Sequence, residues 1–325
     1  MKKNVLFVAG LMVSLMLFAG GNKDAAPTGP ETLTLVAPTG FPAITLAEMI
    51  VDSPVLDENV TLEYKVLESS EVLGATIISG EADLFIAPTN LGVNLYNKGE
   101  EIVNLGSLIW GLLYIATTED ISTWEDLRGR EIAMIGRGLS PDIITRHLLT
   151  VNGLDPEKDV TLNYVQNTTE LAPSFIAGKL PISMMPEPAL SVVKMKRSDT
   201  KIMLDLQKEW EKISGNSSYP QVSLFAKAEV VKNNPQFIQA FVEEYAASIA
   251  RINADPAAAS EKAATYLATP PAPIMAKSIP GGNLNWAPAN VARGALEDYI
   301  SVLIEANPAS VGGQLPDDDF YYPGK

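Results

Sequence analysis

The sequence of 325 residues contains no cysteine and a single histidine. Without cysteine, disulfides and thiol nucleophiles are excluded, and so are zinc sites built from several cysteine and histidine ligands. The lone histidine, His147, lies beside Arg146 in "PDIITRHLLTVNGL", with no serine–carboxylate pattern around it. We interpret His147 as a packing or helix-surface residue rather than a catalytic base. We expect no cofactor, no metal and no catalytic residue.

Positive charge is scarce as well: 24 lysines and arginines face 39 aspartates and glutamates, which gives a formal net charge of -15. Such an acidic protein is a poor match for nucleic acid or for an anionic membrane surface as its main partner. A small ligand responds to local charge, so its sign stays open. Hydrophobic residues make up 46% of the chain, enough for one large domain or two lobes.

A long apolar run occurs at the N-terminus, where two lysines precede residues 5–18 and small residues follow. This pattern is typical of a secretory signal peptide, which we place at residues 1–21. The run is short for a membrane-spanning helix, which needs about 20 residues. We therefore expect an exported protein.

The end of that segment, "LFAGGNKD", resembles a bacterial lipoprotein signal in which Gly21 stands where the lipid-bearing cysteine would be. Residues 22–30 are small and polar and include proline, as a flexible tether would be. The chain is either an ordinary exported protein or a lipoprotein relative whose lipid site is lost. Both place it in the periplasm or at the outer face of the membrane.

The mature chain contains an internal repeat. "VTLEY" at 60–64 returns as "VTLNY" at 160–164. Each copy runs from an apolar strand through a turn into a proline-initiated helix, then a second strand, a helix ending in glycine and a third strand ending in proline. Ser140, before the second helix's proline, is a good N-cap. Three pairs keep offsets of 98 or 99 residues: Gly80 with Gly178, Pro88 with Pro186, and Pro42 with Pro141. Strands alternating with helices predict parallel α/β units.

The predicted fold class is α/β, with two similar Rossmann-like lobes joined by a two-strand hinge. Lobe I comprises 31–118 and 219–325, because the apolar run "QVSLFAK" returns to it and amphipathic helices follow. Lobe II comprises 119–218. Two lobes on such a hinge predict a ligand-binding cleft that closes around its ligand.

Ligands of open parallel sheets bind beyond the carboxyl ends of strands. The repeat places four turns there: 38–42, 87–90, 136–141 and 185–188. Helix starts offer unpaired N–H groups and partial positive charge, so Thr39, Gly40, Gly138 and Ser140 are candidates for binding carboxylate, sulfonate or phosphate-like oxygens.

Charged residues near these turns leave the ligand's sign open. Asp142, in the first turn of the second-lobe helix, can neutralise the positive helix end. Arg137 can restore the balance by holding an anion, or it can pair with a carboxylate. Glu187 either accepts from an amine or ring N–H of the ligand or forms a salt bridge at the hinge.

Three aromatic residues are candidates for contact with a flat or apolar part of the ligand, or else they belong to the lobe cores. They are Phe41 in the first turn, Trp110 near the first crossing and Trp286 in "GGNLNWAP". "GRGLSP" is neither a phosphate-binding P-loop nor a dinucleotide fingerprint, so nucleotide binding is not indicated.

The stretch "ISTWEDLRGREIAMIGRGLSPDIITRHLL" resembles the hinge and second-lobe opening of periplasmic solute-binding proteins of ABC importers, in the group that binds nitrate, sulfonates, taurine and thiamine precursors. "NPQFIQAFVEEYAASIARIN" and "DPAAASEKAA" are similar to its late helices, and "VGGQLPDDDFYY" resembles the ending of one subgroup. The resemblance covers about Glu31 to Tyr322. It implies the type II two-lobe fold and delivery of the ligand to a permease driven by an ATPase. These positions match the family's cleft-lining turns: Thr39, Gly40, Phe41, Thr89, Asn90, Gly138, Leu139, Ser140 and Glu187.

We therefore predict a monomeric, extracytoplasmic solute-binding protein that captures a small organic ligand between its lobes and is not an enzyme. One alternative is an enzyme like those that make the thiamine pyrimidine on this fold, which would need a reactive histidine and no export signal. The other is a ligand-sensing module, usually fused to a membrane helix or an output domain.

Overall fold

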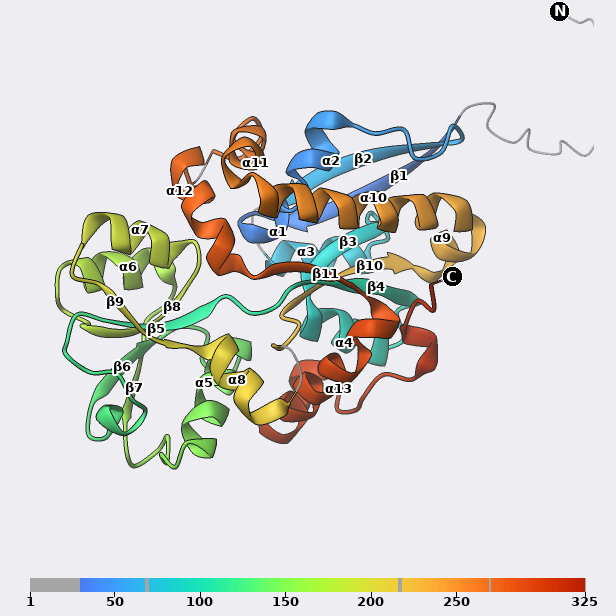
Figure 1. The fold of residues 1–325 in the computed structure, drawn as a ribbon. Coiled ribbons are helices and arrows are strands. Elements are labelled where there is room, and N and C mark those ends of the chain that lie inside the picture. The colour runs from blue at the N-terminus through green and yellow to red at the C-terminus, as the bar shows by residue number, and fades with distance from the viewer. Residues whose placement is uncertain (1–29, 68–69, 216–217, 269, 325) are drawn as a thin grey trace, which may run out of the picture.

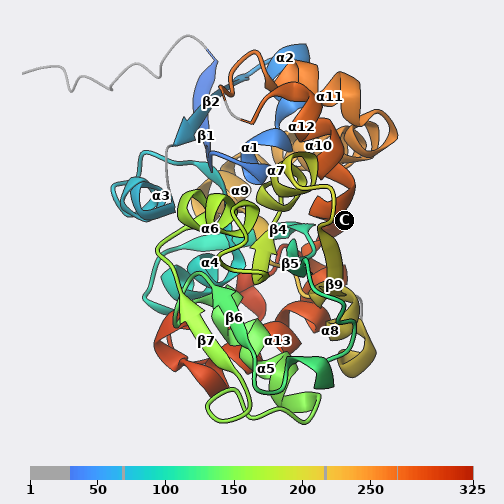
Figure 2. The same ribbon diagram turned by 90° about the vertical axis from the view of Figure 1, so that its left-hand side faces the viewer.

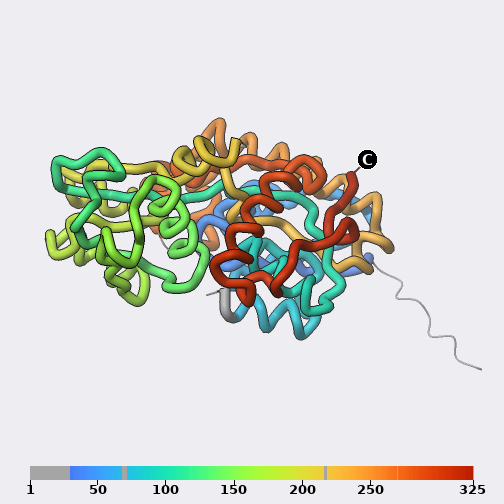
Figure 3. The backbone as a smooth tube through the Cα atoms, turned by 90° about the horizontal axis from the view of Figure 1, so that it is seen from below, coloured from blue at the N-terminus to red at the C-terminus, as the bar shows by residue number. Residues whose placement is uncertain are grey.

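The computed structural model describes residues 30–67, 70–215, 218–268 and 270–324. The predicted signal peptide and nearly all of the tether lie outside the described residues. The chain forms two lobes lying side by side, each built on one mixed β-sheet flanked by helices (Figures 1 and 3). This α/β architecture of two similar lobes confirms the predicted fold class.

Lobe I contains a six-stranded sheet with strand order β11-β4-β10-β3-β1-β2. The three strands predicted from the first repeat pair in parallel, whereas β10, β4 and β11 are antiparallel to their neighbours. Its strands are β1 (Glu31–Pro38), β2 (Val60–Leu67), β3 (Leu84–Pro88), β4 (Ile102–Ile109), β10 (Val222–Lys227) and β11 (Leu284–Pro288). Its α-helices are α1 (Phe41–Ile44), α2 (Ala47–Asp52), α3 (Ser70–Ile78), α4 (Thr89–Asn97), α9 (Ala228–Asn233), α10 (Pro235–Ala254), α11 (Pro256–Ala263), α12 (Ala272–Ser278) and α13 (Ala289–Ala306).

Lobe II contains a five-stranded sheet with order β7-β6-β8-β5-β9. Helices α6 and α7 lie toward one end of lobe II in Figure 2, and α5 and α8 toward the other. Its strands are β5 (Leu113–Thr117), β6 (Glu131–Met134), β7 (Thr161–Tyr164), β8 (Ile182–Pro186) and β9 (Lys201–Asp205). Its helices are α5 (Ser140–Val151), α6 (Thr168–Ile176), α7 (Ala189–Lys196), α8 (Leu206–Ser214) and the 3-10 turn η1 (Glu125–Leu127).

The internal repeat corresponds to a repeated strand order. In lobe I the sequence-repeat strands lie as β3-β1-β2, and in lobe II as β8-β6-β7. The two matching pentapeptides form the outer strands β2 and β7, each parallel to its neighbour. In both lobes the strand that comes from the hinge, β10 or β5, then pairs antiparallel with the third repeat strand. The repeat therefore includes the pairing of the strand that follows each crossing between the lobes.

The first crossing lies earlier than predicted. The prediction ended lobe I at residue 118, but β5 pairs with β8 and β9 in the second sheet. The chain therefore passes between the lobes at residues 110–112. The second crossing, between α8 and β10, returns the chain to lobe I as "QVSLFAK" predicted. The two crossings contact each other, because Gln221 N donates to Ile109 O over 2.9 Å.

A third segment ties the lobes together near the hinge. The 3-10 turn η2 (Ile279–Gly282) follows α12 and leads into β11. The Tyr114 hydroxyl donates to Gly281 O over 2.7 Å, and Asn283 Nδ2 donates to Gly111 O over 3.0 Å. Figure 1 shows this segment beside the first crossing. Sequence reasoning anticipated two connections and missed this non-covalent third one.

An aromatic cluster bridges the lobes on the other side of the hinge. Trp210 of α8 meets Tyr219 at 5.2 Å and Tyr299 of α13 at 6.2 Å between ring centroids. His147 of α5 lies 5.4 Å from the same indole. His147 is thus a packing residue of the interlobe contact, as the sequence interpretation favoured.

The C-terminal "DDDFYY" segment completes lobe I. Phe320 is fully buried, and Tyr321 forms a β-bridge with Asn104 of β4. The Arg293 guanidinium lies 4.6 Å from the centre of the Tyr321 ring and pairs with Asp318 at 2.7 Å. The segment covers the end of the lobe I core instead of projecting toward lobe II.

Candidate ligand-binding site between the lobes

The first predicted turn, Thr39–Phe41, connects β1 to α1. Gly40 has a φ of +93°, a left-handed conformation in which glycine is favoured. Phe41 is 2% exposed, and a Cβ added to Gly282 would lie 2.1 Å from its ring. The ring thus packs directly against the lobe I segment that approaches lobe II, while Thr39 stays exposed and Gly40 half-buried.

The second predicted turn leads from β3 into α4. Thr89 is fully buried, and its hydroxyl bonds to Ser223 at 2.8 Å, which in turn bonds to Ser107 at 3.0 Å. The Thr89 hydroxyl therefore joins the start of α4 to β10 within lobe I. Asn90, the next residue, is half-buried.

The lobe II turn from Arg137 to Ser140 already holds a negative charge beside the start of α5, that of Asp142. Gly138 N donates to Asp142 Oδ2 over 2.7 Å, which is the internal neutralisation that the sequence allowed. Ser140 is the first residue of α5 rather than its N-cap, because Leu139 occupies the cap position, and no side chain caps the start of the helix. Leu139 is 58% exposed.

The two arginines beside that turn take different roles. Arg146 pairs with Asp142 at 2.8 Å, whereas the Arg137 guanidinium lies 5.1 Å from the centre of the Tyr164 ring. Tyr164 also donates to Asp142 over 2.6 Å. The Asp142 carboxylate is thus satisfied by Arg146, Tyr164 and the Gly138 amide, and Arg137 is exposed.

Glu187 lies at the lobe II edge that faces lobe I. It is 8% exposed, and it accepts from Ser191 N and Ser191 Oγ, both at 3.0 Å, which ties it to the first turn of α7. Burial raises the pKa of Glu187, and the Ser191 bonds oppose that shift. A Cβ on Gly281 would lie 2.9 Å from Glu187 Oε1. The carboxylate therefore contacts the lobe I backbone closely, and it forms no salt bridge within the described part of the chain.

A cavity of about 590 Å³ opens beside Glu187, between the lobes. It is the largest of the cavities described here, and α12 and α7 contact each other at its border. Lobe II contributes seven of its lining residues: Tyr114, Glu187, Ser191, Lys194, Met195, Ile202 and Asp205. Lobe I contributes three: Lys277, Pro280 and Gly281.

The charged side chains that line this cavity do not all form ion pairs. Asp205 is held by Lys208, whose side chain lies 3.4 Å away and whose backbone N–H it also caps. Lys194 and Lys277 are exposed and have no ion-pair partner within the described segments. Of the cavity's four charged side chains, two unpaired cations from opposite lobes therefore face a buried carboxylate.

Apolar and aromatic surface completes the cavity. Met195 and Ile202 are 50% and 42% exposed, unusually open positions for large apolar side chains. Burial, followed by the negative charge of Asp205, raises the pKa of Tyr114 to about 12. The Tyr114 phenol therefore keeps its proton at neutral pH and continues to donate to Gly281 O.

A smaller cavity of about 340 Å³ adjoins the first on the other side of Asp205 and contains Trp110. The Trp110 indole is 7% exposed, and its Nε1 donates to Asn285 O over 2.7 Å. Trp286 does not reach the cleft. Its ring packs at 5.4 Å against Tyr245 of α10, within lobe I.

Of the predicted residues, Glu187 lines the larger interlobe cavity and Trp110 the adjoining one. Sequence reasoning missed Tyr114, Lys194, Asp205 and Lys277. Tyr114 and Asp205 carried a detectable signal, because they lie at strand ends facing the hinge. The two lysines carried none, since an exposed lysine on a helix looks like any other.

Within the described residues, no cluster of three or more acidic or histidine side chains is placed to hold a metal ion. In the same part of the chain, no helix combines the length and apolarity needed to cross a bilayer.

The NMT1/THI5-like family model matches residues 56–259 of the chain. No protein with a curated description matches the sequence. Among solved structures, an ABC transporter protein from Parabacteroides distasonis aligns with TM-score 0.76 and 24% identity over 90% of this chain and 99% of that one. The aliphatic sulphonate binding protein SsuA from Escherichia coli aligns with TM-score 0.72 and 16% identity, over 91% and 94%. The alkanesulfonate-binding SsuA of Xanthomonas axonopodis pv. citri, bound to MOPS, gives 0.62 and 14%, over 87% and 94%. At these identities the likeness establishes the fold, that of periplasmic binding proteins.

Proposed function

The chain belongs to the NMT1/THI5-like family, and from that premise we propose that it is the extracytoplasmic solute-binding component of an ABC importer. It captures a small organic anion between its lobes and delivers it to a membrane permease driven by an ATPase. The observation that carries this proposal is the interlobe cavity of about 590 Å³, to which both lobes contribute polar and charged groups. A ligand there holds the two lobes together.

The sign of the ligand follows from the unpaired lysines. Lys194 and Lys277 approach the cavity from α7 and α12, and a carboxylate or sulfonate between them forms charge-assisted hydrogen bonds with both lobes. Glu187 already accepts from Ser191 and faces lobe I backbone, so it shapes the cavity and repels a dianion placed against it. Asp205 is paired with Lys208. The site therefore favours a monoanion.

The apolar wall of the cavity indicates the chemistry of the rest of the ligand. Met195, Ile202 and Pro280 line the cavity, and an aliphatic or flat chain attached to the anionic group covers them. Two solved structures of similar fold are described as sulphonate- or alkanesulfonate-binding proteins, which agrees with this class of ligand. Binding rather than chemistry is favoured because the lone histidine, His147, packs against Trp210 and does not line this cavity.

Export, a monomeric state and the two membrane partners belong to the same proposal. The signal-like segment at 1–21 supports export, and the fold of periplasmic binding proteins supports a role at an importer.

The test is a titration of the purified protein with four C6 probes that differ in one group: hexanesulfonate, hexanoate, hexanol and hexylamine. We expect the two anions to bind and to raise the melting temperature, since a ligand at a hundred times its dissociation constant adds about 2.7 kcal/mol of stability. Each compound is recovered and weighed by mass spectrometry. A chemically altered probe would establish an enzyme instead.

Three variants locate the site. Hydrogen bonds to charged groups contribute about 1.5–3 kcal/mol, so Lys194→Ala and Lys277→Ala should each weaken anion binding at least about tenfold. Lys196→Ala is the matched control, because Lys196 is an exposed lysine on the same helix that does not line the cavity. Binding that survives in the double variant would place the anion elsewhere.

A further inference from the structure

Glu187 is a buried carboxylate that lines the interlobe cavity. Both of its oxygens are held by Ser191, whose N–H donates to Oε2 and whose hydroxyl donates to Oε1, each over 3.0 Å. On the lobe I side the carboxylate meets the backbone of Gly281, where an added Cβ would lie 2.9 Å from Oε1. Among the described residues no basic side chain forms an ion pair with it, so two neutral donors hold a buried negative charge.

Four other charged or titratable side chains line the same cavity. They are Tyr114 of β5, Lys194 of α7, Asp205 at the end of β9 and Lys277 of α12. Asp205 has a partner already, because Lys208 lies 3.4 Å from it. Tyr114 keeps its proton, because burial and then the charge of Asp205 raise its pKa to about 12. The carboxylate of Glu187 is therefore the least supported negative charge of this cavity.

Two influences on Glu187 oppose each other while the cavity holds no anion. Burial raises the pKa of Glu187, whereas the bonds from Ser191 and the charge of Lys194 lower it, and burial has the larger effect. An anion between Lys194 and Lys277 changes this balance, because it takes up the positive charge that favoured the ionised form. It also adds a second negative charge, and like charges repel more strongly in a partly buried site than in water. Both changes favour a protonated Glu187 once the anion is bound.

Binding of the anion and of the proton must then strengthen each other, since two linked equilibria change each other's constants by the same factor. We propose that Glu187 makes anion capture proton-linked: the interlobe cavity takes up a proton from solvent on this carboxylate together with its anion, and it binds the anion more tightly as the pH falls. This inference rests on the proposed function, because it concerns the same cavity. Acidic surroundings then favour capture of the ligand, and a rise toward neutral pH favours its release.

Isothermal titration calorimetry with hexanesulfonate tests the proposal, because the sulfonate keeps its charge at every pH used. Between about pH 8 and about pH 5, we expect the dissociation constant to fall about tenfold as Glu187 becomes protonated. Titrations in two buffers with different ionisation enthalpies count the protons that accompany binding. A tenfold change corresponds to uptake of about half a proton per anion in the middle of this pH range of falling dissociation constant.

Two variants assign the proton to Glu187. Glu187→Gln has the same shape and no proton to exchange, so it should bind hexanesulfonate at every pH about as tightly as the unaltered protein does in acid, without proton uptake. Ser191→Ala removes a hydroxyl that stabilises the ionised carboxylate. It should keep the pH dependence but move its midpoint to higher pH.

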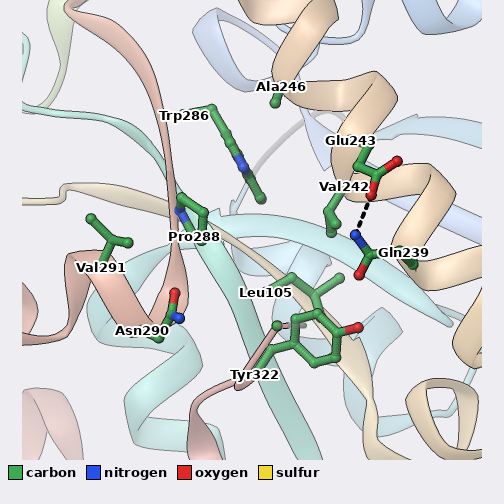
Figure 4. A pocket seen from close by; sticks show the side chains of 11 residues that line it. Leu105, Gln239, Val242, Glu243, Ala246, Trp286, Pro288, Asn290, Val291 and Tyr322 are labelled. Carbon is green, nitrogen blue, oxygen red and sulfur yellow. Dashed lines mark hydrogen bonds between the residues drawn. The ribbon is translucent and has the colours of Figure 1, made fainter.

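The matched control is Glu243→Gln. Glu243 lines a separate cavity of about 360 Å³ within lobe I, where it accepts from the Gln239 side chain (Figure 4). A second control is His147→Gln, because the lone histidine also exchanges a proton at acidic pH but packs against Trp210 outside the cavity. Both variants should retain the full pH dependence of the affinity.

The outcomes distinguish this inference from the function on which it rests. Hexanesulfonate that binds at no pH overturns the proposed function. Hexanesulfonate that binds with the same affinity from acidic to neutral pH, without proton uptake, overturns the proton linkage alone. A pH dependence that persists unchanged in Glu187→Gln, or that disappears in one of the two controls, assigns the proton to another group and overturns the role of Glu187.

Discussion

Replacing Gly282 with alanine tests the contact that joins α1 to the segment facing lobe II. An added Cβ would lie 2.1, 2.7 and 2.8 Å from three atoms of the Phe41 ring, whereas carbon atoms in contact are about 3.5–4.0 Å apart. Because Gly282 has no left-handed φ, the backbone itself tolerates alanine and the effect is steric. Phe41 is 2% exposed, so the ring has nowhere to move freely. Overpacking of this kind costs about 1–3 kcal/mol.

A double-mutant cycle followed by urea unfolding measures that cost. Gly282→Ala alone should lose about 1–3 kcal/mol, and Phe41→Ala alone about 3–5 kcal/mol, the usual cost of deleting a buried ring. In the Phe41→Ala background the extra methyl group has room, so Gly282→Ala should then cost little. The control is Gly294→Ala in the exposed middle of α13, which meets nothing within 4 Å and should stabilise by about 0.5–1 kcal/mol. Equal costs of Gly282→Ala in both backgrounds would refute the reasoning.

Three further changes separate structural from ligand-binding roles. Thr89→Val removes the bond to Ser223 and should cost about 1 kcal/mol in urea unfolding with probe affinity unchanged; a tenfold loss of affinity at unchanged stability would instead make Thr89 a ligand contact. Burial raises the pKa of Glu187, so the folded state holds that proton more tightly, and stability should fall as pH rises from the ordinary glutamate pKa of 4.5 toward the raised value. In Glu187→Gln this loss of stability with rising pH should be absent, and parallel pH–stability curves for the two proteins would contradict the prediction. Burial lowers the pKa of His147 below 6.5, so the stability that the neutral imidazole contributes is complete above pH 6.5 and is lost as the pH falls through the lowered value. His147→Gln should flatten this fall of stability with pH, and an unchanged slope would contradict the prediction.

Local sequence patterns predicted most of the fold. The repeated pentapeptides became β2 and β7, the proline-led runs became helix starts, and the amphipathic stretches became α10 and α13. The lobe boundary was less accurate, because the runs that form β5 and β10 are both short and apolar and nothing local says which sheet each joins. Pairing decides it: β5 lies between β8 and β9, and β10 between β3 and β4.

Sequence reasoning predicted a residue of the candidate site only where that residue directly follows a strand. Glu187 follows β8 directly, so the rule about carboxyl ends of strands identified it. Lys277 lies on a helix far along the chain from Lys194, and only the packing of α12 against α7 brings them to one cavity. For Trp286 the sequence left contact with the cleft and packing in a lobe core both open. The structure shows the second, because β11 directs the ring toward Tyr245 of α10.

The proposal that the anion binds at the two lysines rather than at a helix end has a physical basis. A helix start binds an anion through its free N–H groups, but in α5 Asp142 already accepts from the Gly138 amide and is itself satisfied by Arg146 and Tyr164. An incoming anion there would meet a fixed negative charge. At the interlobe cavity Lys194 and Lys277 face the buried Glu187 carboxylate but form no ion pair within the described residues, so an anion there displaces no formed pair. Because those lysines are exposed, the affinity should weaken as salt rises from 0.05 to 0.5 M, whereas binding at a buried helix end would change little over that range.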